Sequence, residues 1–229
     1  MSGRLAGAFV VLCLWMTGVQ AVQGPLGRTP PGEVRALAPG KFLVASRALR
    51  DPNFAETVVL LTDYDQDGAA GLVVNVRTDV SLARVFDDLS LGANAARVAF
   101  AGGPVARTSA IMLIRSRPGV TGVRSVVPGV DLVATRERLE QTLTSETDPT
   151  RFRVYLGRAG WSPEQLERET LSGAWHVVPA ETDLVFDPEP DTVWRRLIRR
   201  SEMLQANASR PAIRAPNLTV AARPYTQFP

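Results

Sequence analysis

The feature that most constrains the fold is the stretch Leu156–Trp175, which reads LGRAGWSPEQLERETLSGAW. The residues that lead into it, Phe152–Leu156, alternate apolar and polar side chains, which predicts a strand with one buried face. Gly157 and Gly160 permit backbone conformations that a Cβ would hinder, so we expect a turn after this strand. The stretch therefore predicts a strand, a tight turn and a helix in direct succession.

The helix of this stretch has recognisable ends. Ser162 can cap its first free amides, Pro163 suits its first position and Gly173 ends it, after which Trp175 opens the next strand. The side chains expected to face inward are those of Trp161, Gln165 and Leu166, and those expected to face water are Glu167, Arg168 and Glu169. This pattern predicts a packed corner, and it does not specify a reaction.

The N-terminal residues have the pattern of a secretory signal peptide. Arg4 precedes the apolar run Leu5–Gly18, and Val19-Gln20-Ala21 then offers small residues at the two positions a signal peptidase reads. The run is shorter than the roughly 20 residues that span a bilayer. We predict cleavage after Ala21 and an exported or periplasmic protein; the alternatives are an uncleaved anchor and a mis-assigned start, which would leave a cytoplasmic protein. Cleavage would also remove Cys13 and with it any thiolate chemistry.

Composition divides the chain into four parts: a signal peptide at 1–21, an irregular lead-in at 22–39, one domain at 40–204 and a disordered basic tail at 205–229. From Asp191 onward there are seven arginines and two acidic residues. This basic region could contact anionic lipid, nucleic acid or the acidic surface of the body, although a solvated extension is the simpler interpretation. Specific DNA binding is not expected, because the sequence has no helix-turn-helix or zinc-finger pattern.

Apolar periodicity predicts strands at 41–45, 54–64, 70–76, 98–101, 110–115, 152–156, 175–179 and 184–186. Helical spacing predicts helices at 81–89 and 135–144, and a final helix from Asp191 with Val193, Trp194, Leu197 and Ile198 inward and Arg195, Arg196, Arg199 and Arg200 outward. The segment 118–129 is rich in turn-forming residues and should be exposed. Strands outnumber helices, so we predict an α+β fold: a mixed, largely antiparallel sheet with flanking helices in a single domain.

Several strings in the chain resemble the YqgE/AlgH family of bacterial proteins. They are Asp51-Pro52-Asn53-Phe54, the hairpin end Gly68–Asn75, Gly102-Gly103-Pro104-Val105, Leu184–Asp187, Trp194 and the AGW-x-P-x-QLE string. In that last and most specific string and its continuation, the matching residues are Gly157, Gly160, Trp161, Gln165, Leu166, Glu167 and Trp175.

The resemblance implies an α+β fold with a mixed sheet and a biochemical role that is unsettled. One member's name links the family to regulation of alginate synthesis, and some members are described as transcriptional regulators. An exported member could hardly act on transcription. The family has no agreed catalytic residues, so none carries over. Two departures stand out: the usual Asn-Arg-Pro is here Asn75-Val76-Arg77-Thr78, and Arg115 replaces a common histidine.

The glycine-rich turn at Gly102-Gly103-Pro104 is the candidate ligand site. Phosphate-binding loops of this composition need a helix behind them, and Thr108–Arg115 has the pattern of a strand. A tight turn that lets the backbone pass closely is the simpler interpretation. The adjoining polar residues keep an anion site open as a hypothesis, with candidate ligands Gly102, Gly103, Arg107, Thr108 and Ser109.

Other candidates have structural explanations. Asp63–Gly68 copies the start of a calcium loop, but Val74 takes the place of the bidentate glutamate, so a hairpin turn is favoured. His176 is the only histidine, it follows Trp175 in a predicted strand, and no nucleophile-elbow motif accompanies it. Glu164, Glu167 and Glu169 are explained by capping and solvation, and Trp161, Trp175 and Trp194 by the core. We predict no catalytic residue, no metal and no cofactor.

The sequence favours a non-enzymatic, exported binding or regulatory accessory protein. One alternative is a nucleotide- or anion-binding protein with weak hydrolase activity that uses the Gly102 turn. Another is a cytoplasmic transcriptional regulator.

Overall fold

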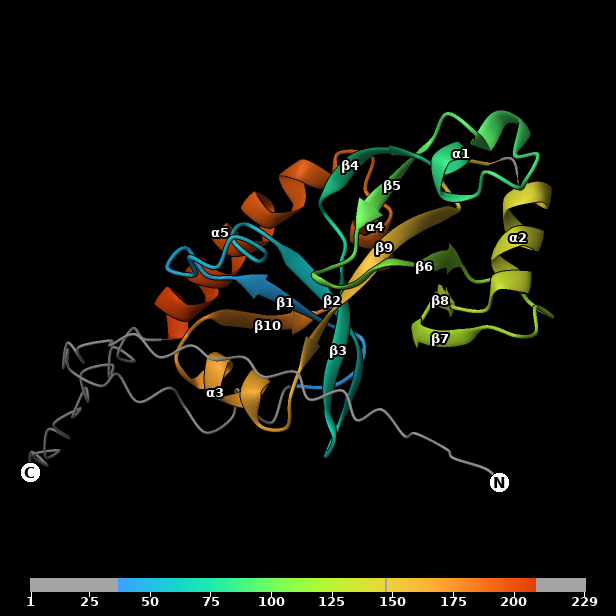
Figure 1. Cartoon of the computed structure of the whole chain (residues 1–229). Coiled ribbons are helices and arrows are strands. Elements are labelled where there is room, and N and C mark those ends of the chain that lie inside the picture. The colour runs from blue at the N-terminus through green and yellow to red at the C-terminus, as the bar shows by residue number, and fades with distance from the viewer. Residues whose placement is uncertain (1–36, 147, 209–229) are drawn as a thin grey trace, which may run out of the picture.

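The computed structural model describes residues 37–146 and 148–208 (Figure 1). The predicted signal peptide and most of the predicted lead-in and tail therefore lie outside the described residues. The strands are β1 (Lys41–Ala45), β2 (Val58–Asp65), β3 (Gly68–Val73), β4 (Arg77–Ser81), β5 (Val98–Ala101), β6 (Val105–Arg115), β7 (Arg124–Val127), β8 (Val130–Val133), β9 (Phe152–Trp161) and β10 (Trp175–Pro179). The helices are α1 (Leu82–Val85), η2 (Gly92–Asn94), α2 (Arg136–Ser145), α3 (Gln165–Leu171), α4 (Thr182–Val185) and α5 (Pro190–Ala208).

The strands form one 10-stranded sheet in the order β10-β1-β2-β3-β9-β6-β8-β7, with β4 and β5 attached through β9. Each pairing is antiparallel except that of β5 with β9, which is parallel. Figure 1 shows α3 and α5 beside β1 and β10, and α2 toward the opposite end of the sheet. The predicted α+β class, with a mixed, largely antiparallel sheet and flanking helices, is confirmed.

Strand β9 is the centre of the sheet, because it pairs with β3, β5 and β6. The predicted turn at Gly157–Gly160 is wrong: the strand continues to Trp161. Gly157 has a left-handed φ of 73°, so the strand is irregular at this residue but does not end there. Further along the same strand, Gly160 pairs with Ala70 of β3. The two glycines therefore shape a strand that changes neighbours along its length.

The turn at Gly102-Gly103-Pro104 crosses β9 at this irregular point. A Cβ on Gly103 would overlap the backbone of Arg158, and a Cβ on Gly157 would lie 2.5 Å from the carbonyl oxygen of Gly103. Two backbone segments can approach this closely only where neither carries a side chain. The interpretation of the Gly102 turn as a close backbone crossing is confirmed.

Three predicted strands and one predicted exposed segment need correction. The strand expected at 54–64 begins at Val58, because the amides of Phe54 and Ala55 bond to the Asp51 carbonyl in a turn. The strand expected at 184–186 is the short helix α4, closed by the Phe186 amide on the Thr182 carbonyl. The strand expected at 110–115 begins five residues earlier as β6, and the exposed segment 118–129 contains β7.

Three predicted helices also differ from the structure. The helix expected at 81–89 is the short α1, and Ser81 makes no side-chain cap. Helix α3 begins at Gln165 and not at Pro163, because Glu164 has a left-handed φ of 60°. Gln165 reaches back instead, and its Oε1 accepts the Ser162 amide at 3.1 Å. Helix α5 extends to Ala208, so residues 205–208 of the predicted disordered tail are helical.

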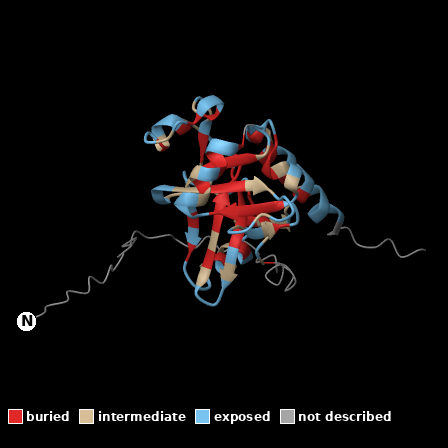
Figure 2. Ribbon diagram, turned by 90° about the vertical axis from the view of Figure 1, so that its right-hand side faces the viewer, coloured by how far each residue is buried: buried red, intermediate tan, exposed pale blue. Residues whose placement is uncertain are grey.

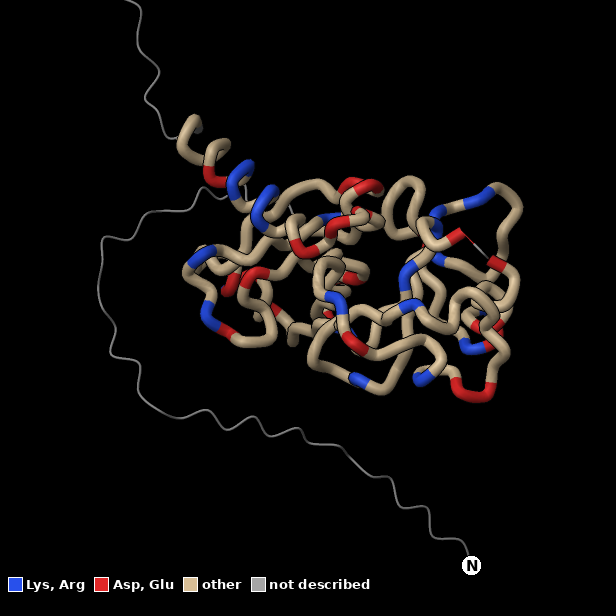
Figure 3. The backbone as a smooth tube through the Cα atoms, turned by 90° about the horizontal axis from the view of Figure 1, so that it is seen from above, with Lys and Arg blue, Asp and Glu red and all other residues tan. Residues whose placement is uncertain are grey.

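Helix α5 covers one end of the sheet as its periodicity predicts. Val193, Trp194, Leu197 and Ile198 are buried, and the four intervening arginines face outward. Figure 2 shows the buried strands at the centre of the molecule, and Figure 3 shows basic segments along the helix that leads to the C-terminal trace. Two of these arginines, Arg196 and Arg200, pair with Asp187 and Glu181 of the body. Within the described residues, no helix is long and apolar enough to cross a membrane.

The side chain of Asn75 fastens the start of β2 to the end of the hairpin. Its Oδ1 accepts the Val58 amide at 2.7 Å and its Nδ2 donates to the Glu56 carbonyl at 3.1 Å. We expect Asn75→Ala to lower the free energy of unfolding by about 2–3 kcal/mol, because a buried amide loses its acceptor. Urea denaturation followed by circular dichroism measures this. Asn207→Ala, on the exposed end of α5, is the matched control, and an equal loss in both variants would contradict the assigned role.

Candidate functional site

The best candidate site is a cavity of about 510 Å³, hereafter the Asn53–Arg107 pocket. Its polar lining is Asn53, Thr57, Thr78 and Arg107. The remaining lining is apolar or glycine: Pro52, Ala55, Val73, Val76, Ala101, Gly103, Pro104 and Leu156. Three of the strings that carry the family resemblance therefore meet around one cavity.

Local turns position the polar residues of this pocket. Asp51 accepts both the amide and the side-chain Nδ2 of Asn53, at 2.8 and 3.1 Å, which fixes the Asn53 side chain. Next to it, an Nη of Arg107 donates to Asn53 Oδ1 at 3.3 Å. An uncharged amide and a guanidinium thus lie side by side at the rim, with donors left for a ligand.

Two residues near this pocket have strained backbones. Glu56 has φ of 59° and Ala106 has φ of 51°, values that favour glycine. Ala106 lies where the register between β6 and β9 shifts, between Val105 and Ala110, and immediately precedes Arg107. Such irregularities in strands re-aim a side chain and cluster at functional sites. Here the irregularity turns Arg107 toward Asn53.

The structure brings together some of the predicted ligand residues and separates others. Gly103 and Arg107 line the pocket. Gly102 is buried against Gly157, and Thr108 and Ser109 are exposed on β6 outside the lining. Sequence reasoning did not select Asn53 as a ligand residue, although it lies in the Asp51–Phe54 string; the Asp-Pro-Asn turn pattern was the available signal.

Trp161 of the AGW-x-P-x-QLE string belongs to a different feature, hereafter the tryptophan cluster: Phe54, Trp161, Trp175 and Glu169. The Phe54 ring stacks on Trp161 at 5.9 Å and meets Trp175 edge-on at 5.7 Å. Glu169 Oε2 accepts both indole N–H groups, at 2.9 Å from Trp161 and 2.8 Å from Trp175. The prediction that Glu169 faces water is wrong, because this carboxylate is the shared acceptor of two buried indoles.

Glu167 was also expected to face water. Its carboxylate instead accepts the Tyr64 hydroxyl at 2.7 Å. Burial of that hydroxyl, together with this hydrogen bond, raises the pKa of Tyr64 to about 12. Of the three glutamates, only Glu164 is solvated as predicted, with 84% of its side chain exposed. Leu166 is buried as predicted, and with Glu167 and Glu169 it ties α3 to the sheet.

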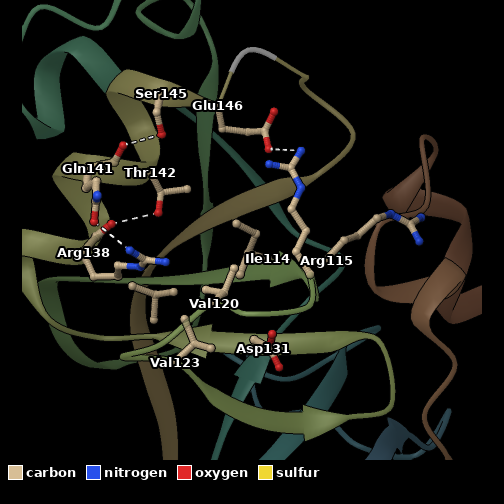
Figure 4. A pocket seen from close by; sticks show the side chains of 12 residues that line it. Ile114, Arg115, Val120, Val123, Asp131, Arg138, Gln141, Thr142, Ser145 and Glu146 are labelled. Atoms are coloured by element: carbon tan, nitrogen blue, oxygen red, sulfur yellow. Dashed lines mark hydrogen bonds and ion pairs between the residues drawn. The ribbon is translucent and has the colours of Figure 1, made fainter.

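A smaller cavity of about 170 Å³ lies under α2 (Figure 4). Two of its polar side chains are paired within the protein: Arg138 donates to Gln141 at 2.7 Å, although its buried Nε makes no hydrogen bond, and Glu146 pairs with Arg117 at 2.8 Å. Figure 4 shows the Arg115 side chain directed away from this cavity, and its guanidinium donates to Asp183. The cavity under α2 is therefore a weaker candidate than the Asn53–Arg107 pocket.

The other chemical candidates fit structural roles. Asp63–Gly68 is the hairpin between β2 and β3, and Asp63 pairs with Arg124 at 3.1 Å. His176 is half-buried on β10 opposite Val44 of β1. Trp194 is buried and donates to the Ala45 carbonyl at 2.8 Å. In the ranges that the structure covers, no group of three histidine, cysteine or acidic side chains is placed to hold a metal ion.

These features define a class of protein: a single-domain α+β protein whose curled sheet holds a small, mixed polar and apolar pocket beside its central strand. The AlgH-like family model matches residues 42–205. A UPF0301 protein of Streptomyces avermitilis is 39% identical over 177 residues, covering 73% of this chain and 88% of that protein. A UPF0301 protein of Anaeromyxobacter sp. (strain Fw109-5) is 42% identical over 179 residues, covering 72% and 87%.

Solved structures agree with this match. The solution structure of the AlgH protein from Pseudomonas aeruginosa superposes with a TM-score of 0.60 at 26% identity, covering 80% of this chain and 97% of that one. A crystal structure of a protein from Corynebacterium diphtheriae gives a TM-score of 0.61 at 25% identity, covering 72% and 87%. The chain belongs to the AlgH-like family, as its sequence strings predict.

Proposed function

We propose that this protein is a non-enzymatic, exported binding or regulatory accessory protein that takes a small ligand in the Asn53–Arg107 pocket. The observation that carries the proposal is the convergence of three family strings on one cavity. Its volume of about 510 Å³ lies within the range of small-molecule pockets, roughly 300–1,000 Å³.

The chemistry of the lining supports binding without turnover. Thr57 Oγ1 donates to the Phe54 carbonyl at 2.8 Å, and Thr78 Oγ1 donates to the Ala99 carbonyl at 2.7 Å, so neither hydroxyl is paired with a base. The other polar side chains of the lining, Asn53 and Arg107, supply hydrogen-bond donors. The lining thus offers hydrogen bonds and one positive charge for recognition.

The same lining indicates the class of ligand. Most of its walls are aliphatic or proline side chains, and the single guanidinium lies at the rim beside the Asn53 amide. A ligand with an apolar body and one anionic group fits both parts. A carboxylate can accept from Arg107 and Asn53 together while its hydrocarbon chain covers Val73, Val76 and Leu156.

Hexanoate and its uncharged analogue hexanamide test this proposal by amide NMR titration of the mature protein. We expect hexanoate to shift the signals of Asn53, Gly103 and Arg107, and Arg107→Gln to weaken hexanoate binding about tenfold, the loss of one charged hydrogen bond. Arg84→Gln, an exposed arginine of α1, is the control for net charge. Equal affinity for hexanoate and hexanamide, or shifts confined to other regions, would refute the assignment of the pocket.

The exported location rests on the predicted signal peptide at 1–21. Cell fractionation followed by N-terminal sequencing of the mature protein tests it directly. We expect the chain to begin at Val22 in the exported fraction. An intact N-terminus in the cytoplasm would contradict export and would favour the cytoplasmic regulator.

A further inference from the structure

A second cavity of about 570 Å³ has a different chemical character from the Asn53–Arg107 pocket. Its lining contains four arginines and no acidic residue, and we refer to it as the arginine pocket: Arg77, Arg97, Arg115 and Arg153, with Phe100, Phe186, Ala96, Val98, Pro149, Thr150 and Pro188. The arginines come from β4, the loop before β5, the end of β6 and β9. Figure 1 shows β4, β5, β9 and α4 gathered in one region of the molecule.

Three of these arginines have no carboxylate partner among the described residues. Arg77 donates to the Pro188 carbonyl at 2.6 Å, and Arg97 donates to the carbonyls of Pro149 and Phe152 at 2.7 and 3.0 Å. Arg153 donates to the carbonyls of Val185 and Asp187. Carbonyl oxygens hold the guanidinium groups in place, and the nearest acidic side chains act on Arg97 and Arg153 without forming an ion pair. In contrast, Arg115 pairs with Asp183.

The buried charge of Arg153 makes this arrangement energetically costly for the protein without a ligand. It is only 8% exposed, and a buried charge is normally paired with an opposite one. Burial lowers the pKa of Arg153; Tyr155 and Asp187 oppose this effect, and the charge of Arg77 adds to it. Burial also lowers the pKa of Arg97, and so does the charge of Arg153. Arg153 thus lies close enough to Arg77 and to Arg97 for its charge to be repelled by one and to repel the other at the same cavity.

Ring contacts fix three of the guanidinium groups, and the shortest of these contacts places Arg97 over the Phe152 ring at 4.1 Å. Arg153 lies over the Phe100 ring at 4.6 Å, and Arg115 lies over the Phe186 ring at 4.8 Å. Stacking of this kind holds the planar group in one orientation with its N–H donors directed sideways. The arginines are therefore oriented before any ligand arrives, which reduces the entropy lost on binding.

We propose that the arginine pocket binds the phosphate dianion of a small phosphate monoester. Three guanidinium groups that line one cavity and form no ion pair match a group that carries two negative charges and several terminal oxygens. A carboxylate offers one charge and two oxygens, which is too little for this cavity. The side chains of Ala96, Val98 and Pro188 leave an apolar wall, so an ester with an apolar body fits better than one with a polar body.

Isothermal titration calorimetry of the mature protein at pH 7.5 tests this proposal, because a phosphate monoester is mostly dianionic there. The probes are phenyl phosphate, benzenesulfonate as a monoanion of similar shape, glucose 6-phosphate as an ester with a polar body, and inorganic phosphate. We expect phenyl phosphate to bind most tightly and benzenesulfonate at least tenfold more weakly. We also expect added sodium chloride to weaken phenyl phosphate binding.

Arg77→Gln is the decisive variant, because Arg77 is exposed on β4 and its loss leaves the core intact. We expect it, and separately Arg97→Gln, to weaken phenyl phosphate binding at least tenfold, whereas Arg84→Gln leaves it unchanged. Circular dichroism confirms that each variant is folded. Wild-type affinity in both Arg77→Gln and Arg97→Gln, or benzenesulfonate binding as tightly as phenyl phosphate, would overturn the proposal. If glucose 6-phosphate bound more tightly than phenyl phosphate, the proposed preference for an ester with an apolar body would be wrong.

A failure of the phosphate proposal is distinguishable from a failure of the proposed function. Hexanoate reports on Arg107 in one pocket, and phenyl phosphate reports on Arg77 in the other. Each can bind or fail to bind without the other, and Arg84→Gln is the charge control for both.

Discussion

Glu169→Ala is expected to lower the free energy of unfolding by about 2–5 kcal/mol, because it leaves two buried indole N–H groups without an acceptor. Both Trp161 and Trp175 donate to Glu169 Oε2, and Gln165 Nε2 donates to Oε1 at 2.8 Å. The indoles are 5% and 3% exposed, so water replaces the carboxylate poorly. Urea denaturation followed by tryptophan fluorescence measures both the loss and any change around the indoles.

Two further variants separate the hydrogen bonds from the charge. Glu169→Gln keeps one acceptor oxygen for the indoles, so we expect a loss of about 1 kcal/mol. Glu164→Gln removes a carboxylate from the residue that precedes α3, at a solvated position, and should change stability by no more than about 0.5 kcal/mol. If Glu169→Ala were as mild as Glu164→Gln, the carboxylate would not be the support of the tryptophan cluster.

The second large effect is expected for Gly157→Ala, at about 3–5 kcal/mol or a failure to fold. A Cβ at this position would lie 2.5 Å from the Gly103 carbonyl oxygen and 2.9 Å from that of Val105, so two backbone segments would have to separate. Strain from the left-handed φ of 73° adds about 1–2 kcal/mol.

Gly119→Ala is a matched control for this prediction. Gly119 has φ of 77°, nearly the same value, but nothing lies within 4 Å of a Cβ built there. We expect it to lose only the strain, about 1–2 kcal/mol. Urea midpoints of the two variants, or the soluble yield if Gly157→Ala does not fold, measure the difference. Losses that agree within about 0.5 kcal/mol would show that the close crossing with Gly103 is unimportant.

Periodicity predicted those parts of the fold that follow regular geometry. Helix α5, with Val193 and Trp194 inward, and strand β1 needed only the spacing of apolar side chains. Strand β9 shows where this reasoning stops. Gly157 and Gly160 are compatible with a turn and also with a strand that bulges, and only the pairing with β3 decides between them. The local sequence does not show which strand will pair with these residues.

The errors at Glu167 and Glu169 have a similar cause. Charged residues on a short helix are usually solvated, and α3 would satisfy that rule in isolation. Tyr64 comes from a strand about a hundred residues earlier, and Trp161 and Trp175 flank the helix on both sides. A glutamate between two tryptophans was the only signal available, and spacing alone does not show that both indoles turn toward it.

The candidate sites were predicted in part. Gly103 and Arg107 were selected for their resemblance to an anion loop, and the structure places both in one pocket with Asn53. The arginine pocket was not predicted, because Arg77, Arg97 and Arg153 lie far apart in a chain that is rich in arginine. Their distinguishing property is the absence of carboxylate partners within the described residues, which only the three-dimensional arrangement reveals.

The measurement that tests the binding role most directly is a crystal structure of the mature protein soaked with saturating hexanoate. We predict density in the Asn53–Arg107 pocket, with the carboxylate bonded to Arg107 and the Asn53 amide and the hydrocarbon chain against Val73 and Leu156. An empty pocket under those conditions, with hexanoate ordered only elsewhere on the surface, would contradict the proposal that this cavity is the ligand site.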